Sequence, residues 1–180
     1  MLEGRVIRNL VLIGFMGVGK STVAQSVAVQ LGFDYLDTDS AIEATLGKPI
    51  ARIFAEDGEA RFRACESALV ADLTRRTRFV VATGGGLAAN AEHLASLKTH
   101  ALVACLWASA ETIWERVRTQ SHRPLLQTPD PLSRIRALLA ERAPFYRQAD
   151  LLVNTEMRSA KEVANQVLLQ FRAVCQDDPT

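Results

Sequence analysis

Short apolar runs alternate with longer amphipathic segments along this chain. The runs at 9–13, 79–82, 101–106 and 151–153 have the length and continuous apolar character of strands that are buried on both faces of a parallel sheet, and a further short strand is predicted at 35–37. Between the strands, apolar side chains recur every three or four residues, which predicts helices. The predicted helices cover residues 20–31, 40–46, 50–56, 59–76, 110–119, 132–147 and about 159–174.

Strands that alternate with helices favour an α/β fold. The pattern predicts a three-layer α/β/α sandwich with a central five-stranded parallel sheet. The 180 residues contain no repeat and no low-complexity linker, and their number suits one domain, which we expect to span residues 1–180. In sheets of this kind, ligands bind beyond the carboxyl ends of the strands.

Charge and cysteine content narrow the class of protein. The formal net charge is +1, so the field of the whole molecule gives no reason to expect a nucleic acid or an acidic membrane as a partner. No segment approaches the roughly 20 consecutive apolar residues of a membrane span. The three cysteines, Cys65, Cys105 and Cys175, fit neither a disulfide framework nor a zinc site, which favours a reducing cytoplasm as the location.

The most specific motif follows the first predicted strand directly. Residues 14–21 read GFMGVGKS and fit the phosphate-loop pattern GxxxxGK[ST] at every position. The glycines let the backbone curl until successive N–H groups face an anion, and the next helix adds its positive dipole end. Lys20 is expected to reach the β- and γ-phosphates, and Ser21 to bind Mg²⁺. The predicted ATP-binding residues of this segment are Gly17, Val18, Gly19, Lys20, Ser21 and Thr22.

The phosphate loop alone does not distinguish a kinase from a GTPase or a motor ATPase. A guanine-specific GTPase is expected to carry an NKxD-type base reader late in the chain, and the sequence contains none. The chain is also short for an ATPase whose cycle is driven by a partner. These features favour a small-molecule kinase.

Two acids follow the short predicted strand at 35–37. Asp37 and Asp39 are two residues apart, so on an extended segment their side chains point the same way, toward the phosphate loop. One carboxylate can then hold Mg²⁺ through water, while the other orients an acceptor hydroxyl and takes its proton. The alternative is that Asp39 only caps the helix that begins near Ser40.

Several segments beyond the phosphate loop, taken in order, match one family of kinases. They read DTD at 37–39, GKPI at 47–50, IFAEDGE at 53–59, FR at 62–63 with Glu66, GGG at 84–86, RPLL at 123–126 and ERAPFY at 141–146. Each match is weak by itself, but together they keep one order from Gly14 to Tyr146, which covers most of the chain. On these residues the sequence resembles the shikimate kinase family.

The resemblance implies an acceptor-binding region at about 37–66, completed by later residues. The base would also hold the hydroxyl groups of shikimate, two arginines would bind its carboxylate, and the backbone of the triple glycine would position its ring. The substrate-binding residues implied in this way are Asp39 as the base, Arg63, Gly84, Gly85, Gly86 and Arg142. The reaction would phosphorylate the 3-hydroxyl of shikimate in the synthesis of aromatic amino acids.

The resemblance also implies ATP as co-substrate and Mg²⁺ as cofactor, in a protein that we expect to be a monomer. Asp37 would support the metal with Ser21. A mobile lid at about 120–131 would carry Arg123 over the phosphates, where it would act in catalysis with Lys20 and Asp39. Further along the chain, Arg118 and Arg158 would flank the adenine.

Simpler interpretations of the same residues remain open at this stage. Arg63 can form helix-surface ion pairs with Glu59 and Glu66, and Arg142 can pair with its neighbour Glu141. The triple glycine can be a turn that ends a strand, and Arg123 can be a solvated loop charge. The alternative functions are a kinase of another small hydroxy acid and a non-catalytic nucleotide-binding paralogue.

Overall fold

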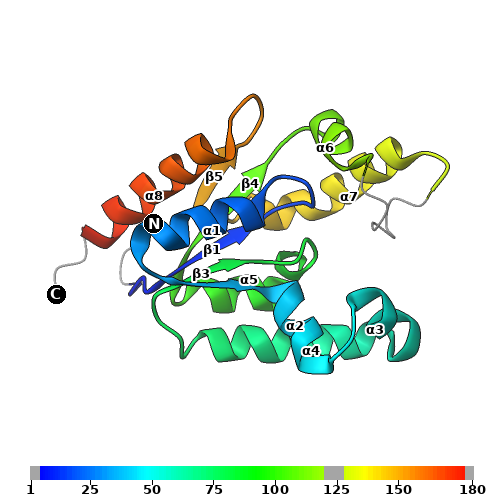
Figure 1. Ribbon diagram of the computed structural model, residues 1–180, viewed down its shortest axis with the longest axis horizontal. Coiled ribbons are helices and arrows are strands. Elements are labelled where there is room, and N and C mark those ends of the chain that lie inside the picture. Colours follow the sequence, from blue (N-terminus) through cyan, green and yellow to red (C-terminus); the bar gives the residue numbers. More distant parts are fainter. Residues whose placement is uncertain (1–4, 120–127, 177–180) are drawn as a thin grey trace.

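A single parallel sheet organises the protein. The computed structural model describes residues 5–119 and 128–176, and Figure 1 shows their arrangement. The strands are β1 (Asn9–Ile13), β2 (Asp34–Asp37), β3 (Phe79–Ala82), β4 (Ala101–Trp107) and β5 (Leu151–Asn154). They lie in the order β2-β3-β1-β4-β5, and every pair is parallel.

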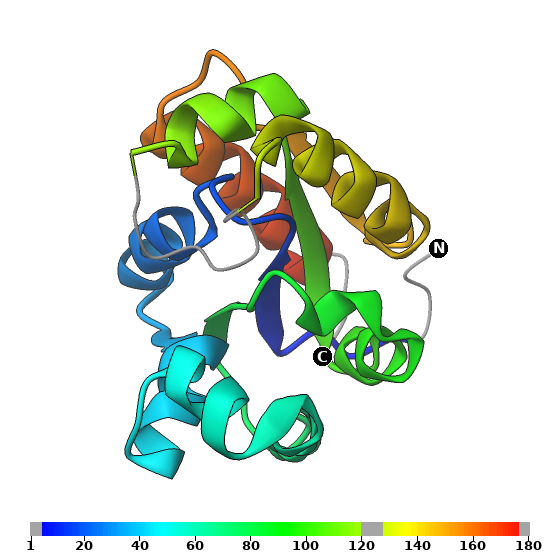
Figure 2. The same cartoon turned by 90° about the vertical axis from the view of Figure 1, so that its right-hand side faces the viewer.

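Helices cover both faces of this sheet. Helices α1 (Lys20–Leu31) and α8 (Ala160–Gln176) pack against each other on one face, and α5 (Ala91–Lys98) and α7 (Pro131–Tyr146) cover the other, as Figure 2 shows. A short helix, α6 (Ala110–Val117), packs beside α7. The predicted three-layer α/β/α sandwich with a five-stranded parallel sheet is therefore confirmed.

The main hydrophobic core lies between the sheet and its two helical layers. Strands β1 and β4 form its centre, and all five residues of β1 are fully buried. This explains why their sequences are continuous apolar runs rather than alternating ones, because both faces of a central parallel strand are covered.

The three helices that connect β2 to β3 in the sequence pack around a second, smaller hydrophobic core. Helices α2 (Thr38–Leu46), α3 (Ile50–Glu56) and α4 (Gly58–Leu73) form a group at one end of the molecule. Ile42, Ile53 and Phe62 are buried there and form a cluster separate from the main core. The region predicted to bind the acceptor thus has packing of its own.

The structure also differs from the sequence-based prediction in several elements. The prediction missed α5 and the short 3₁₀ helix η1 (Leu87–Ala89). Asn90 caps α5 by accepting hydrogen bonds from the N–H groups of Glu92 and His93, and Asn is a preferred capping residue, so this signal was present in the sequence. Helix α4 ends at Leu73, whereas the prediction continued it to residue 76.

The expectations about the lid and about membrane spans can be compared only with the residues that the structure describes. The predicted lid at about 120–131 falls largely on residues 120–127, which lie outside them, as does Arg123. Across residues 5–119 and 128–176, none of the helices combines the length and the apolar character that crossing a bilayer requires.

Candidate active site

All five strands end at the same edge of the sheet, and the predicted site residues gather there. The phosphate loop follows β1, Asp37 ends β2 and the triple glycine follows β3. The loops that follow β4 and β5 complete this edge (Figure 1). Parallel strands bring these distant segments together because their carboxyl ends point the same way.

The phosphate loop fits tightly over the end of β4. Gly14 has a φ of 135°, and a Cβ atom at this position would lie 2.2 Å from the carbonyl oxygen of Leu106. No larger residue fits there. Gly19 has a φ of 93° and directly precedes α1, so the loop enters the helix through a left-handed turn that glycine adopts without strain.

Lys20 is the first residue of α1, and its side chain folds back over the loop. Its ammonium group donates hydrogen bonds to the carbonyl oxygens of Gly14 and Phe15, both at 2.9 Å. The side chain is almost completely buried. The geometry therefore holds a fixed positive charge beside the curled backbone, where phosphate oxygens can take over these contacts.

Asp37 connects the phosphate loop to the acceptor side. One of its carboxylate oxygens accepts a hydrogen bond from the Ser21 hydroxyl at 2.9 Å, and the other accepts from the backbone N–H groups of Asp39 and Ser40. Asp37 is thus the N-cap of α2. The alternative that Asp39 is the cap is wrong, because the helix begins at Thr38 rather than near Ser40.

Asp39 lies in the first turn of α2, so the picture of two acids on one extended strand is also wrong. Burial and the negative charge of Asp37 raise the pKa of Asp39 to about 6, although the positive charge of Lys20 opposes this shift. The buried Thr38 beside it accepts a hydrogen bond from the N–H of Gly84 at 2.8 Å. This bond fixes the start of α2 against the triple glycine.

The triple glycine is the point where the acceptor residues meet. A Cβ atom at Gly84 would lie 2.2 Å from a carboxylate oxygen of Asp39. At Gly85 the nearest side-chain atom would be a guanidinium nitrogen of Arg142, at 3.5 Å. At Gly86 it would be a guanidinium nitrogen of Arg63, at 3.2 Å. Each glycine therefore faces one of the three side chains, and this turn does more than end a strand.

Arg142 is a buried cation. Only 8% of its surface is exposed, its guanidinium lies over the ring of Phe15 at 5.3 Å, and it donates a hydrogen bond to the carbonyl oxygen of Gly85 at 2.7 Å. Among the described residues no carboxylate lies within 4.0 Å of it, so the predicted alternative of a pair with Glu141 does not form. A buried guanidinium of this kind is suited to an anionic ligand.

Arg63 forms the helix-surface ion pairs that its sequence pattern allows, and it also lies at the predicted acceptor site. It forms ion pairs with the buried carboxylate of Glu66 at 2.7 Å and with the exposed carboxylate of Glu59 at 2.9 Å. Its guanidinium nevertheless lies against Gly86 and remains about half exposed. The ion pairs therefore hold the side chain at the edge of the turn.

A cleft of about 300 Å³ joins the donor and acceptor sides. It is lined by Met16, Gly17, Gly19, Lys20, Ser21, Thr22, Asp37, Asp39, Thr83, Gly84, Gly85 and Arg116. Arg63 and Arg142 are not part of this lining but flank the glycine turn that is. The phosphate loop, Asp39 and part of the glycine turn thus share one cleft, and the two acceptor arginines lie beside it.

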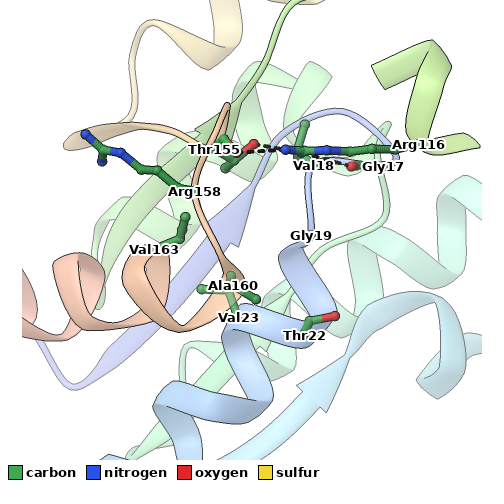
Figure 3. A pocket seen from close by; sticks show the side chains of 10 residues that line it. All are labelled: Gly17, Val18, Gly19, Thr22, Val23, Arg116, Thr155, Arg158, Ala160 and Val163. Carbon is green, nitrogen blue, oxygen red and sulfur yellow. Dashed lines mark hydrogen bonds between the residues drawn. The ribbon is translucent and has the colours of Figure 1, made fainter. Parts of the chain in front are cut away.

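A second pocket of about 220 Å³ lies between the phosphate loop and the start of α8. Figure 3 shows Arg116 reaching toward the loop after β5, where it donates hydrogen bonds to the carbonyl and hydroxyl oxygens of Thr155 at 2.7 and 2.9 Å. Arg116 also donates to the carbonyl oxygen of Gly17 at 3.4 Å. Arg158 lines this pocket as well, with its guanidinium bonded to Gln166.

The arginine of α6 that lines this pocket, Arg116, was not among the predicted site residues. Arg118 is exposed, forms an ion pair with Glu115 at 3.0 Å and lines neither pocket, whereas Arg116 lines both. Helical spacing could have identified Arg116, because it shares a face with the buried Ile113 and Val117 while Arg118 faces away. Thr38 was missed too, and a lone threonine carries no comparable signal.

The oxygen atoms of Ser21 and Asp37 fit a magnesium ion. They are already within hydrogen-bond distance of each other beside Lys20. Mg²⁺ prefers oxygen ligands and usually keeps several waters, with only one or two ligands from the protein and the rest from phosphates. The described residues contain no group of three or more His, Cys, Asp or Glu side chains that could bind a metal without a nucleotide.

The fold and the site together define a P-loop kinase of small molecules, in which a phosphate cradle shares one cleft with a carboxylate, and two arginines flank the glycine turn beside it. The family model described as shikimate kinase matches residues 16–172. The chain therefore belongs to the shikimate kinase family.

Individual relatives agree over nearly the full chain. A shikimate kinase of Thermodesulfovibrio yellowstonii is 42% identical, with 91% of this chain and 95% of the relative covered. One of a Synechococcus strain is 45% identical over 91% of this chain and 86% of the relative. The solved structure of shikimate kinase from Acinetobacter baumannii in complex with shikimate superposes with a TM-score of 0.87 at 36% identity, covering 93% of this chain and 94% of that one.

Proposed function

We propose that this protein transfers the γ-phosphoryl group of ATP to the 3-hydroxyl of shikimate, giving shikimate 3-phosphate and ADP for aromatic amino acid synthesis. Family membership carries the reaction class. The single structural observation that carries the substrate is the glycine turn at 84–86, where Asp39, Arg142 and Arg63 meet beside Lys20. A base and two guanidinium groups at one point suit a hydroxylated carboxylic acid.

On the donor side, the chain supplies fixed positive charge and N–H groups. The backbone at Gly17, Val18 and Gly19 and the start of α1 surround the phosphates, and Lys20 neutralises charge on the γ-phosphoryl group as it is transferred. Ser21 and Asp37 would hold Mg²⁺, which would supply further charge neutralisation for the transferred phosphoryl group. The second pocket, with Arg116 and Arg158, is the proposed place for the nucleoside.

On the acceptor side, the proposed roles follow from position and charge. Arg142 and Arg63 bind the carboxylate, while Asp39 accepts the proton of the attacking hydroxyl. A pKa of about 6 leaves the Asp39 carboxylate mostly ionised at neutral pH, yet close enough to that pH to take a proton efficiently. A small polar acid buries little apolar area, so its affinity must come from charge-assisted hydrogen bonds, each worth about 1.5–3 kcal/mol.

Some parts of this proposal rest on sequence alone. Arg123 lies outside the described residues, and its contact with the phosphates follows only from the family resemblance. The monomeric state stays a prediction. So does the cytoplasmic location, which rests on the pattern of Cys65, Cys105 and Cys175, all three of which are free thiols.

An acceptor screen with coupled detection of ADP tests the proposal. Purified protein with ATP and Mg²⁺ should release ADP with shikimate but not with gluconate or a nucleoside monophosphate. Turnover on one of those acceptors instead of shikimate would overturn the substrate. Calorimetric binding of shikimate without ADP release would favour the non-catalytic paralogue.

A further inference from the structure

Tyr146 has no role in the proposed chemistry, although its hydroxyl reaches the centre of the acceptor site. It is the last residue of α7 and is 7% exposed. Its hydroxyl donates a hydrogen bond to the carbonyl oxygen of Gly85 at 2.9 Å. Arg142, four residues earlier on the same helix face, donates to the same oxygen at 2.7 Å.

The Gly85 carbonyl therefore has two donors, and a carbonyl oxygen has two lone pairs to accept them. Gly85 also packs against the phosphate loop, because a Cβ atom there would lie 3.5 Å from the backbone nitrogen of Met16 and 3.9 Å from the carbonyl oxygen of Gly14, as well as 3.5 Å from Arg142. The peptide at Gly85 is thus a contact between the donor and acceptor sides. Its orientation affects both.

The two donors differ in what binding demands of them. Arg142 is a buried cation without a carboxylate partner among the described residues, so it is the donor that an incoming carboxylate attracts. If it were the sole partner of Gly85, its turning away would leave a partly buried carbonyl without a protein donor, which is unfavourable. Tyr146 keeps the carbonyl satisfied while Arg142 changes partner.

We propose that Tyr146 is a positioning residue for acceptor binding: its hydroxyl holds the Gly85 carbonyl, so that Arg142 can bind the carboxylate of the acceptor without disturbing the glycine turn. This inference rests on the proposed function. Burial raises the pKa of Tyr146 to about 12, so the hydroxyl remains a donor at neutral pH.

The test is a double-mutant cycle between Tyr146→Phe and Arg142→Ala. The Phe variant keeps the ring and removes only the hydroxyl. In the otherwise wild-type protein, the dissociation constant for shikimate should rise about three- to tenfold, as expected for one hydrogen bond. In the Arg142→Ala background the same change should have an effect of less than about twofold, since the donor that moves is already absent.

Three readouts separate the possible outcomes. Calorimetry gives the dissociation constants for shikimate and for ADP, and coupled kinetics gives kcat. We expect the ADP constant and kcat to stay within about twofold of wild type in Tyr146→Phe. A Thr99→Val variant, which removes a hydroxyl bonded to the carbonyl oxygen of Ser96 before β4, serves as a control that should change none of these values.

An equal effect of Tyr146→Phe in both backgrounds would overturn the inference, because Tyr146 would then act independently of Arg142. Weaker binding of ADP by the same factor as shikimate would overturn it too, since it would indicate general loosening of the fold. No effect on shikimate would show that the hydroxyl is dispensable. If the wild-type protein itself failed to bind or phosphorylate shikimate, the proposed function would fail with it, and that result is visible before any variant is made.

Discussion

The donor and acceptor sides of the site are built in different ways. The phosphate-binding part of the donor side is one contiguous segment, residues 14–22, whose backbone follows a central strand of the main core. The acceptor side consists of side chains from three helices far apart in the sequence, Asp39 on α2, Arg63 on α4 and Arg142 on α7, and these meet only at the glycine turn. The phosphates are therefore bound mainly by the backbone of one short segment, whereas the acceptor is bound by side chains that only the tertiary fold brings together.

This difference has consequences for specificity and for tolerance to change. A backbone cradle binds any polyphosphate of the right shape, so the phosphate loop identifies the donor and leaves the acceptor open. The acceptor is recognised by a few charged groups whose positions depend on long-range packing. Single substitutions on the acceptor side should therefore affect the acceptor alone, while the nucleotide still binds.

The largest effect is expected for Asp39→Asn. The amide keeps the shape of the side chain but cannot accept the proton of the hydroxyl, so kcat should fall about 10²–10⁴-fold, the range that general-base catalysis contributes. Binding of ADP, measured by calorimetry, should remain close to wild type because the donor side is untouched. A kcat near that of wild type would reject Asp39 as the base, and lost ADP binding would show that the two sides are not separable.

Arg142→Ala should have the next largest effect, on shikimate rather than on ATP. Removing one charge-assisted hydrogen-bonding group costs about 1.5–3 kcal/mol, so the KM for shikimate should rise about 10–10²-fold. Steady-state kinetics with each substrate varied in turn provides the measurement. Arg147→Ala, one turn further on and exposed, is the matched control and should change neither constant. If Arg142→Ala raised the KM values for shikimate and for ATP equally, the role of this arginine would be structural.

The pH dependence should show the raised pKa of Asp39. Because the base must be ionised, kcat/KM for shikimate should fall about tenfold for each pH unit below about 6 and level off above it. The residual activity of Asp39→Asn should not show this fall in kcat/KM below about pH 6. A limb near pH 4, the ordinary range of an aspartate, would mean that burial does not perturb this carboxyl.

The raised pKa of Asp39 should affect stability in the opposite direction to activity: acid lowers kcat/KM but favours the folded state. Between about pH 4 and 6 the folded protein binds the Asp39 proton more tightly than the unfolded chain does, so this group favours folding in acid and its contribution is lost as the pH rises through 6. At pH 7 the Asp39→Asn variant should therefore have a higher Tm than wild type. Thermal unfolding followed by circular dichroism at pH 4 and pH 7 checks this, and an unchanged Tm at both values would contradict it.

The contrast between the contiguous phosphate loop and the dispersed acceptor residues also explains how well each could be predicted from the sequence. The strand, loop and helix around the phosphate motif were predicted correctly because the motif is contiguous and its flanking strand and helix have clear periodicity. The acceptor residues were identified through a family resemblance, since periodicity alone does not bring α2, α4 and α7 to one turn. The cap at Asp37 and the position of Arg116 in both pockets depend on where a helix starts and which face it buries. Helix boundaries are the least predictable feature, so the cap was misassigned and Arg116 was missed.

The smallest effect tests whether the two sides are also packed separately. Ile53 and Ile13 are both fully buried, Ile53 in the small core of α2, α3 and α4 and Ile13 in the main core just before the phosphate loop. Replacing either one by Val removes one methyl group and should lower the free energy of unfolding by about 0.5–1.5 kcal/mol, measured by urea denaturation. Ile53→Val should raise the KM for shikimate by no more than about threefold and leave that for ATP unchanged, whereas Ile13→Val should do the reverse, because each cavity loosens only the side that it supports. If both variants changed both constants equally, the donor and acceptor sides would share one packing unit, and the contrast between them would lie in chemistry alone.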